Sequence, residues 1–312
     1  MKLSQTKGVF AEFGYYPKNI DIENERFSVE TLPDYADAVT RVTEDPNILN
    51  DWIYPGNKKN YNFMTREITS LPFTNRNFGL PKTHILKLKG NENEEDLDFV
   101  VWCLSFFTGM RLTIQEAGFL DATPIKQGKL VDFVLIESSL EDVINLALDY
   151  LDLERNNFRA TKRVIGIIHT LFLAQYPHSL PFERFQYLYM SLDTCYKITQ
   201  TKCNASSTSA STHASRVQWM CEYYDIVVPS WAIINGKCSQ ISSVRNDTIH
   251  ESLFFDEPLG FAIYENFNGN VILQMQHLIC RLLVAILGKP NISYVKSSVQ
   301  TRQRQGLNLL EK

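Results

Sequence analysis

The spacing of apolar residues changes once along this chain, near Ser138, and this change constrains the fold more than any other feature. Before it, short runs such as His84–Lys89 and Lys129–Ile136 alternate apolar and polar side chains, which is typical of half-buried β-strands. The apolar block Phe99–Met110 is expected to form a helix packed on that sheet. After Ser138, apolar residues recur every three or four positions, as on the buried face of an amphipathic helix. The sequence therefore predicts an α+β protein, with a mixed but mostly β N-terminal domain over residues 1–137 followed by an all-α bundle.

Helix start and stop signals divide residues 138–290 into six helical segments with short connections. The first segment opens with Ser138 or Ser139 as its N-cap, because a serine hydroxyl accepts a hydrogen bond from a free backbone amide of the first turn. The last segment ends at Gly288, with Pro290 beyond it, which is a common way for a helix to stop. We expect these segments to pack as one helical bundle.

The net charge excludes one class of nucleic-acid-binding protein. The chain has 31 lysines and arginines against 35 acidic residues, for a formal net charge of −4. A protein that binds nucleic acid over its whole surface is strongly basic, so general binding of this kind is not expected. The final residues, 291–312, are the exception, because they carry four basic side chains (Lys296, Arg302, Arg304 and Lys312) against one acidic side chain. They predict a flexible, mildly basic tail.

Cysteine usage and hydropathy indicate a cytoplasmic protein that does not enter a membrane. The six cysteines are scattered and include no Cys-x-x-Cys pair, so no disulfide framework is expected. Cys195, Cys203, His213 and Cys221 are spaced too widely for a compact zinc motif, and we expect no metal or cofactor. The N-terminus lacks the apolar core of a secretory signal. The apolar stretch Leu278–Gly288 is too short to cross a bilayer.

One polar segment, Ser242–Glu251, carries the side chains best suited to chemistry, and no P-loop, dinucleotide, zinc-protease or serine-hydrolase motif competes with it. Arg245 offers a permanent planar cation that matches two oxygens of a phosphate. His250 can exchange protons near neutral pH. On an α-helix Asn246 and His250 share a face, while Arg245 lies about 140° around the axis from His250. The arginine side chain must therefore reach back to join the same site.

This segment, inside a helical domain, resembles the HEPN superfamily of endoribonucleases, and in particular the C-terminal domain of ApeA-like proteins. That family has an arginine followed, after four to six residues, by a histidine. The motif is followed by an acidic, glycine-containing stretch, here Glu251–Gly260, and by a closing hydrophobic helix that ends in Leu-Gly, here Leu287–Gly288. The segment Pro181–Phe185 also resembles the start of that family's core helix. The likeness covers about residues 138–290.

The resemblance implies a metal-independent endoribonuclease that acts as a homodimer through the helical domain. In this reaction the ribose 2′-hydroxyl attacks the adjacent phosphorus and leaves a 2′,3′-cyclic phosphate and a 5′-hydroxyl, so the substrate is RNA. His250 is then the proton-transfer group, and Arg245 holds the phosphate and stabilises the transition state. Asn246 orients the phosphate or His250, while Asp247 holds the arginine or contributes to the dimer. Two motifs facing each other across the dimer supply a second histidine and a second arginine.

Other interpretations of individual residues stay open at this level. Asn246 and Asp247 also suit the first turn of a helix, where they satisfy backbone donors and complement the helix dipole. Arg163 and His169 match the same Arg–His spacing. They flank the apolar run Val164–Ile168, however, so we interpret that segment as a core helix rather than as a second site.

Other functions also stay open. A non-catalytic HEPN-type dimer, acting as a scaffold or as a nucleotide- or RNA-binding module, would use the same two side chains. The resemblance further implies a toxin or an anti-phage defence effector that cleaves tRNA or another structured RNA. A phage-derived trigger or an antitoxin would then regulate it, with the N-terminal domain as the sensor. Alternatively, the N-terminal domain binds a ligand of its own and carries the main function.

Overall fold

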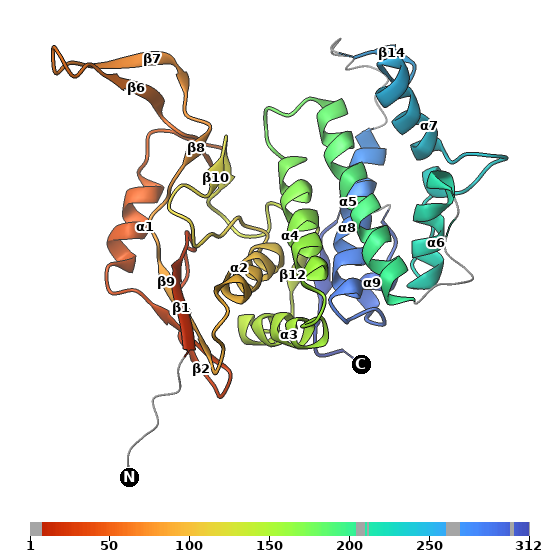
Figure 1. The fold of residues 1–312 in the computed structure, drawn as a ribbon, viewed down its shortest axis with the longest axis horizontal. Coiled ribbons are helices and arrows are strands. Elements are labelled where there is room, and N and C mark those ends of the chain that lie inside the picture. Colours follow the sequence, from red (N-terminus) through yellow and green to blue (C-terminus); the bar gives the residue numbers. More distant parts are fainter. Residues whose placement is uncertain (1–7, 204–209, 211, 260–268, 300–302, 312) are drawn as a thin grey trace. The chain divides into compact units, whose positions relative to one another are not determined.

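The computed structural model describes the chain apart from residues 1–7, 204–209, 211, 260–268, 300–302 and 312. The chain divides into two compact units, Met1–Lys129 and Leu130–Lys312 (Figure 1). Both helices and strands are present, which confirms the α+β class. The expected boundary after residue 137 lies eight residues too late, because strand β12 (Phe133–Leu135) pairs in parallel with β15 (Gln305–Leu307) inside the second unit.

The first unit is built on a four-stranded antiparallel sheet with the strand order β1-β9-β3-β2. Its strands are β1 (Gly8–Phe13), β2 (Ile22–Glu23), β3 (Phe27–Thr31) and β9 (His84–Lys89). Leu86 and Leu88 of the central strand are buried while Lys87 is exposed, as the alternating sequence predicted. Helix α2 (Glu94–Thr108) contacts this sheet, which confirms the helix expected around Phe99–Met110.

Smaller elements complete the first unit. They are α1 (Tyr35–Thr43), β4 (Ile48–Leu49), β5 (Trp52–Ile53), β6 (Asn57–Tyr61), β7 (Ile68–Thr74), β8 (Asn77–Phe78), β10 (Phe119–Leu120) and β11 (Thr123–Pro124). Strands β6 and β7 form an exposed hairpin. The remaining strands form two small sheets: β10 pairs with β8, and β11, β5 and β4 form a three-stranded sheet in the order β11-β5-β4.

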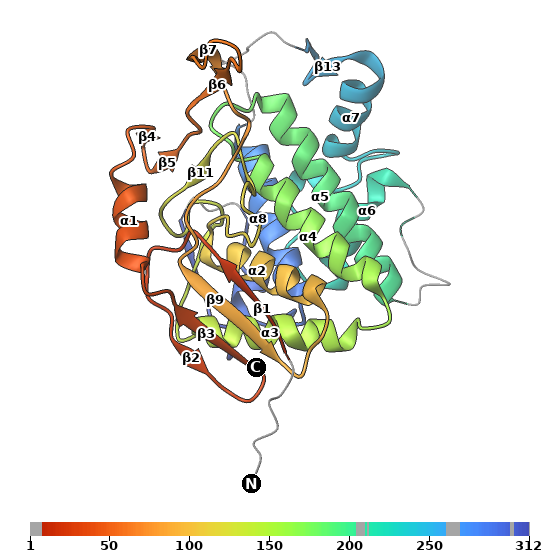
Figure 2. The same ribbon diagram turned by 60° about the vertical axis from the view of Figure 1, so that its left-hand side comes forward.

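The second unit is mostly helical, with α4, α5 and α8 side by side at its centre (Figures 1 and 2). Its longer helices are α3 (Leu140–Leu153), α4 (Phe158–Leu173), α5 (Pro181–Lys202) and α8 (Gly269–Ile286). The shorter ones are the 3₁₀ turns η1 (His213–Ser215) and η2 (Ser230–Ala232) and the α-helices α6 (Arg216–Tyr223), α7 (Gln240–Asn246) and α9 (Ser293–Lys296). Short strands β13 (Leu253–Phe254) and β14 (Glu257–Pro258) form a hairpin. The expectation of an all-α bundle was therefore wrong, because the second unit also contains short strands.

The sequence signals for the helix ends fit the structure closely. Ser139 is the N-cap of α3, and it forms a capping box with Asp142. The neighbouring Ser138 instead accepts a hydrogen bond at its Oγ from the backbone amide of Leu309, 2.7 Å away. Helix α8 ends at Ile286, two residues before Gly288, whose positive φ of 113° suits a residue without a side chain.

The C-terminal residues differ most from the prediction. Within their described part, Tyr294, Val295, Leu307 and Leu309 are buried, and β15 pairs with β12. The expected flexible tail is therefore a packed part of the second unit, because apolar side chains lie between its basic residues. Two of those basic residues, Arg302 and Lys312, lie outside the described residues.

Candidate functional site

The predicted motif spans the end of α7 and a π-helical segment, Asp247–Glu251, that follows directly. Arg245 and Asn246 occupy the last turn of α7. The segment ends at Ser252, whose left-handed φ of 58° breaks the helix. Hairpin β13–β14 comes next, and its Phe254 packs on Phe185 of α5 with ring centroids 5.5 Å apart. The motif is thus tethered to the central helix from its C-terminal side; Gly260, the end of the predicted acidic stretch, lies outside the described residues.

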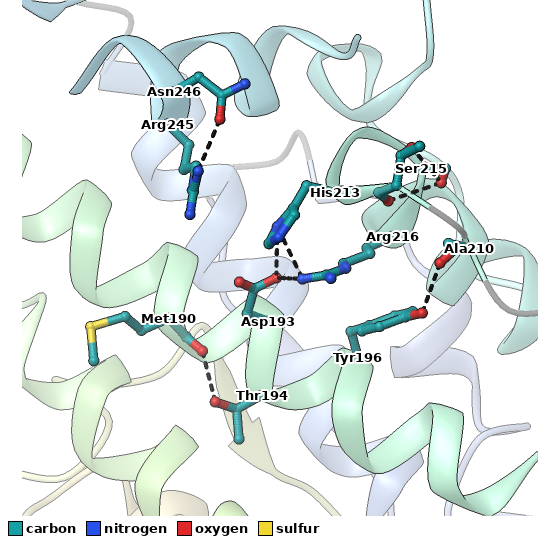
Figure 3. A network of polar contacts seen from close by, with 11 residues as sticks. Met190, Asp193, Thr194, Tyr196, Ala210, His213, Ser215, Arg216, Arg245 and Asn246 are labelled. Carbon is teal, nitrogen blue, oxygen red and sulfur yellow. Dashed lines mark hydrogen bonds and ion pairs between the residues drawn. The ribbon is translucent and has the colours of Figure 1, made fainter. Parts of the chain in front are cut away.

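Arg245 is half-buried and keeps much of its bonding capacity unused. Its Nη1 donates a hydrogen bond to Oδ1 of Asn246 at 2.9 Å. Its Nε is buried without a hydrogen-bond partner in the described part of the chain. Figure 3 shows the guanidinium extending from α7 toward α5, on the side where Asp193 lies. Among the described residues no carboxylate forms an ion pair with Arg245, so its positive charge is not neutralised locally.

His250 and Asn246 are exposed, while Asp247 is half-buried. No hydrogen bond joins the Arg245 and His250 side chains within the ranges that the structure describes. The i→i+5 bonding of a π-helical segment puts more residues into each turn than an α-helix does. Positions five apart along the chain therefore come closer to one face than the α-helical geometry allows. The structure places Arg245 beside Asn246 and leaves His250 open to solvent.

A second polar group lies next to Arg245 and was not predicted from the sequence. Asp193 of α5 accepts a hydrogen bond at Oδ1 from Nη1 of Arg216, 2.9 Å away (Figure 3). The same Nη1 lies 3.0 Å from Nδ1 of His213, and that Nδ1 lies 3.8 Å from Oδ1 of Asp193. The guanidinium of Arg216 also stacks over the ring of Tyr196, with its Cζ 4.7 Å from the ring centroid. Asp193 therefore holds the arginine, and the arginine in turn contacts the histidine.

The charges of this group act on each other. Partial burial lowers the pKa of His213, the positive charges of Arg216 and Arg245 lower it further, and Asp193 opposes them. Burial raises the pKa of Tyr189 to about 12, and the fields of Asp193, Arg245 and Arg216 all reach its hydroxyl. At neutral pH the histidine is therefore neutral and the tyrosine protonated. Together with Arg245, the group has two fixed positive charges and one negative charge.

Two other groups of residues were considered in the sequence analysis, the set of cysteines with His213 and the segment between Arg163 and His169. Cys195 and Cys221 are fully buried, and among the described residues no set of three or more histidine, cysteine or acidic side chains is arranged to hold a metal ion. The segment Val164–Ile168 lies in α4 with Val164, Ile167 and Ile168 fully buried. The interpretation of this segment as a core helix is therefore confirmed.

Comparisons of this chain with protein-family models, with curated proteins and with solved structures find no match. The HEPN resemblance therefore stays a prediction. In the part of the chain that the structure describes, no helix has the length and apolar character needed to cross a membrane.

Proposed function

We propose that the unit Leu130–Lys312 is a metal-independent endoribonuclease that acts as a homodimer, with Arg245 and His250 as its catalytic residues. The observation that carries the proposal is that the positive charge of Arg245 is partly buried and not paired with a carboxylate among the described residues. Its guanidinium is half-buried, points away from its own helix, and has no carboxylate partner among the described residues. Removing a charge from water without a partner is unfavourable, and a bound phosphate would offset that cost.

The proposed mechanism needs one group to move protons and one to hold charge. His250 is exposed, so an RNA strand can approach its imidazole from solvent. It takes the proton from the 2′-hydroxyl, or gives one to the leaving 5′-oxygen. Arg245 holds the phosphate oxygens, which carry more negative charge in the transition state than in the substrate. Asn246 fixes the arginine through its 2.9 Å hydrogen bond, and the half-buried Asp247 contributes to the dimer surface.

A homodimer supplies the second histidine that an acid and a base together require. The side chain of Ile249, next to His250, is 52% exposed. An apolar side chain beside the exposed histidine suits a surface that a second copy of the chain covers. The two motifs would then face one another across the twofold axis.

The wider role follows from the resemblance and is part of the same proposal. The substrate would be a structured RNA such as tRNA, which places the activity in the cytoplasm. The protein would serve as a toxin or an anti-phage effector, restrained by an antitoxin or released by a phage-derived trigger. The first unit, Met1–Lys129, would act as the sensor.

The test is cleavage of labelled tRNA by the purified full-length chain in the presence of EDTA. We expect His250→Ala to lower the rate by about 10²- to 10⁴-fold, the usual contribution of a general acid or base. Arg245→Gln should lower it by a similar factor. The matched control is His178→Ala, since His178 is also an exposed histidine of the second unit but lies between α4 and α5.

Circular dichroism and thermal unfolding establish that each variant is folded. Equal rates for His250→Ala and the wild-type chain would contradict the proposal. RNA binding by the wild type without any cleavage would favour a non-catalytic HEPN-type module instead.

A further inference from the structure

The group beside the motif, together with Arg245 of the motif itself, brings together side chains from three separate parts of the second unit. Asp193 comes from α5, His213 and Arg216 from η1 and the start of α6, and Arg245 from the end of α7 (Figure 3). Asp193 holds Arg216, whose Nη1 lies 2.9 Å from the Asp193 Oδ1, and the same Nη1 lies 3.0 Å from Nδ1 of His213. The stacking of Arg216 over Tyr196 holds the guanidinium on its other side.

The charges in this group do not balance. Asp193 neutralises one guanidinium, that of Arg216, and Arg245 has no acidic partner in the described part of the chain. The Nε atoms of Arg216 and Arg245 are both buried without a hydrogen-bond partner there. Unsatisfied buried donors are rare and unfavourable, and an anion that draws Arg245 outward would relieve its Nε without breaking an ion pair. The surplus of positive charge is therefore suited to an anion with several acceptor oxygens.

His213 supplies a further donor. Because its Nδ1 lies 3.0 Å from the donor Nη1 of Arg216, we assign Nδ1 as the acceptor and place the proton of the neutral ring on Nε2. The lowered pKa of His213 keeps the ring neutral near pH 7. The His213 side chain is 43% exposed, against 18% for Arg216. The histidine therefore forms the outer rim of the group, and its Nε2–H can donate to a ligand from solvent.

We propose that His213, Arg216 and Arg245 bind a phosphate group of RNA, with Asp193 as the positioning residue. The identity of the ligand as RNA rests on the proposed function. Two guanidinium groups match the oxygens of one phosphate, each through charge-assisted hydrogen bonds. The carboxylate of Asp193 repels the phosphate, but it fixes the direction of Arg216, which in turn donates to His213. This phosphate is the one that Arg245 holds in the proposed reaction, so Arg245 is shared by the phosphate site and the motif that carries His250.

The test measures binding separately from cleavage. A fluorescent single-stranded RNA whose riboses are all 2′-O-methylated has no free 2′-hydroxyl, so it cannot undergo the proposed reaction. Its dissociation constant is measured by anisotropy with the full-length chain at several KCl concentrations. We expect Arg216→Gln to weaken binding at least about tenfold. It should also lower the slope of log K against log salt by about 0.7, the value for one lost phosphate contact on a single strand.

Two further variants keep the test informative if Arg216→Gln unfolds the protein. Arg216→Lys keeps the charge but loses the planar fork, so it should weaken binding and leave the salt slope almost unchanged. His213→Gln keeps an amide near the position of Nε2 and should weaken binding less than Arg216→Gln. The matched control is Arg159→Gln, because Arg159 is an exposed arginine in the first turn of α4. It should leave both the affinity and the slope unchanged.

The outcomes separate this inference from the proposed function. Equal affinity and equal slope for the Arg216 and Arg159 variants, or no binding by the wild type, would overturn the phosphate site. If His250→Ala still abolished cleavage of natural RNA, the proposed function would stand without it. Conversely, loss of binding in Arg216→Gln with no cleavage by the wild type would support the phosphate site and reject the nuclease.

Discussion

The buried ion pair between Arg281 and Asp132 should couple α8 to the ends of the second unit. Arg281 is fully buried, and Asp132 is nearly so. The Nη1 of Arg281 donates to Oδ2 of Asp132 at 2.7 Å, and the hydroxyl of Tyr294 donates to the other carboxylate oxygen at 2.5 Å. The remaining guanidinium donors bond the backbone oxygens of His277, Ser297 and Ser298 and the Ser297 hydroxyl. Every donor of this arginine is therefore satisfied.

Removing one partner leaves the other charge buried and unpaired, which costs about 3–5 kcal/mol. We expect Arg281→Met and Asp132→Asn each to lower the free energy of unfolding by an amount in this range. The double variant has no uncompensated charge. It should cost less than the sum of the two single variants, by up to about 3 kcal/mol of coupling energy.

The assay is urea unfolding of the four proteins in the cycle, followed by circular dichroism at 222 nm, which is weighted toward the helical unit. Hydrogen exchange of peptides from α8 and β15 shows whether both ends of the network loosen together. Additive costs within about 0.5 kcal/mol, or a cost below about 1 kcal/mol for Asp132→Asn, would refute the reasoning.

Three smaller predictions concern other parts of the fold. Burial lowers the pKa of His84 to about 4, below the unfolded value of 6.5. The first unit should therefore be fully stabilised by this group above pH 6.5 and lose up to about 3 kcal/mol as pH falls to 4, and His84→Phe should flatten that dependence in pH-dependent urea unfolding. Ser139→Ala removes the capping box of α3 and should lower stability by about 1 kcal/mol, measured by thermal unfolding against the wild-type chain. Gly109→Ala should cost about 1–2 kcal/mol, because this residue ends α2 with a left-handed φ of 62°; a thermal midpoint equal to that of the wild type would contradict this.

The sequence predicted the long helices well because each has one continuous apolar face. Helices α3, α4, α5 and α8 all appear where the helical period was expected, and the capping box with Asp142 decides between Ser138 and Ser139 in favour of Ser139. The fate of the C-terminal residues was not predictable in this way. Their packing depends on partners far along the chain: the hydroxyl of Tyr294, for example, bonds to Asp132. The one local signal for such a buried polar partner was Arg281, a lone arginine in the apolar run of α8.

The site was predictable only in part. Arg245 and His250 were proposed from one short motif with an α-helical period, but the π-helical segment Asp247–Glu251 does not follow that period. The group around Asp193 has no local motif, since its members come from α5, α6 and η1 and meet only in the folded unit. The spacing of His213 and Arg216, three residues apart at the start of a helix, was the only signal in the sequence. The π-helical turn is a property of the backbone and leaves no mark in the residue pattern.

The chemistry of the cleaved ends tests the central claim most directly. The full-length chain is incubated in EDTA with an RNA of defined sequence, and with the same strand carrying one 2′-deoxyribose at each mapped cleavage position. We predict products with a 2′,3′-cyclic phosphate and a 5′-hydroxyl, no cleavage at the deoxyribose, and at least about 100-fold slower cleavage by His250→Ala. Products with a 3′-hydroxyl and a 5′-phosphate, or undiminished cleavage by His250→Ala, would contradict the account.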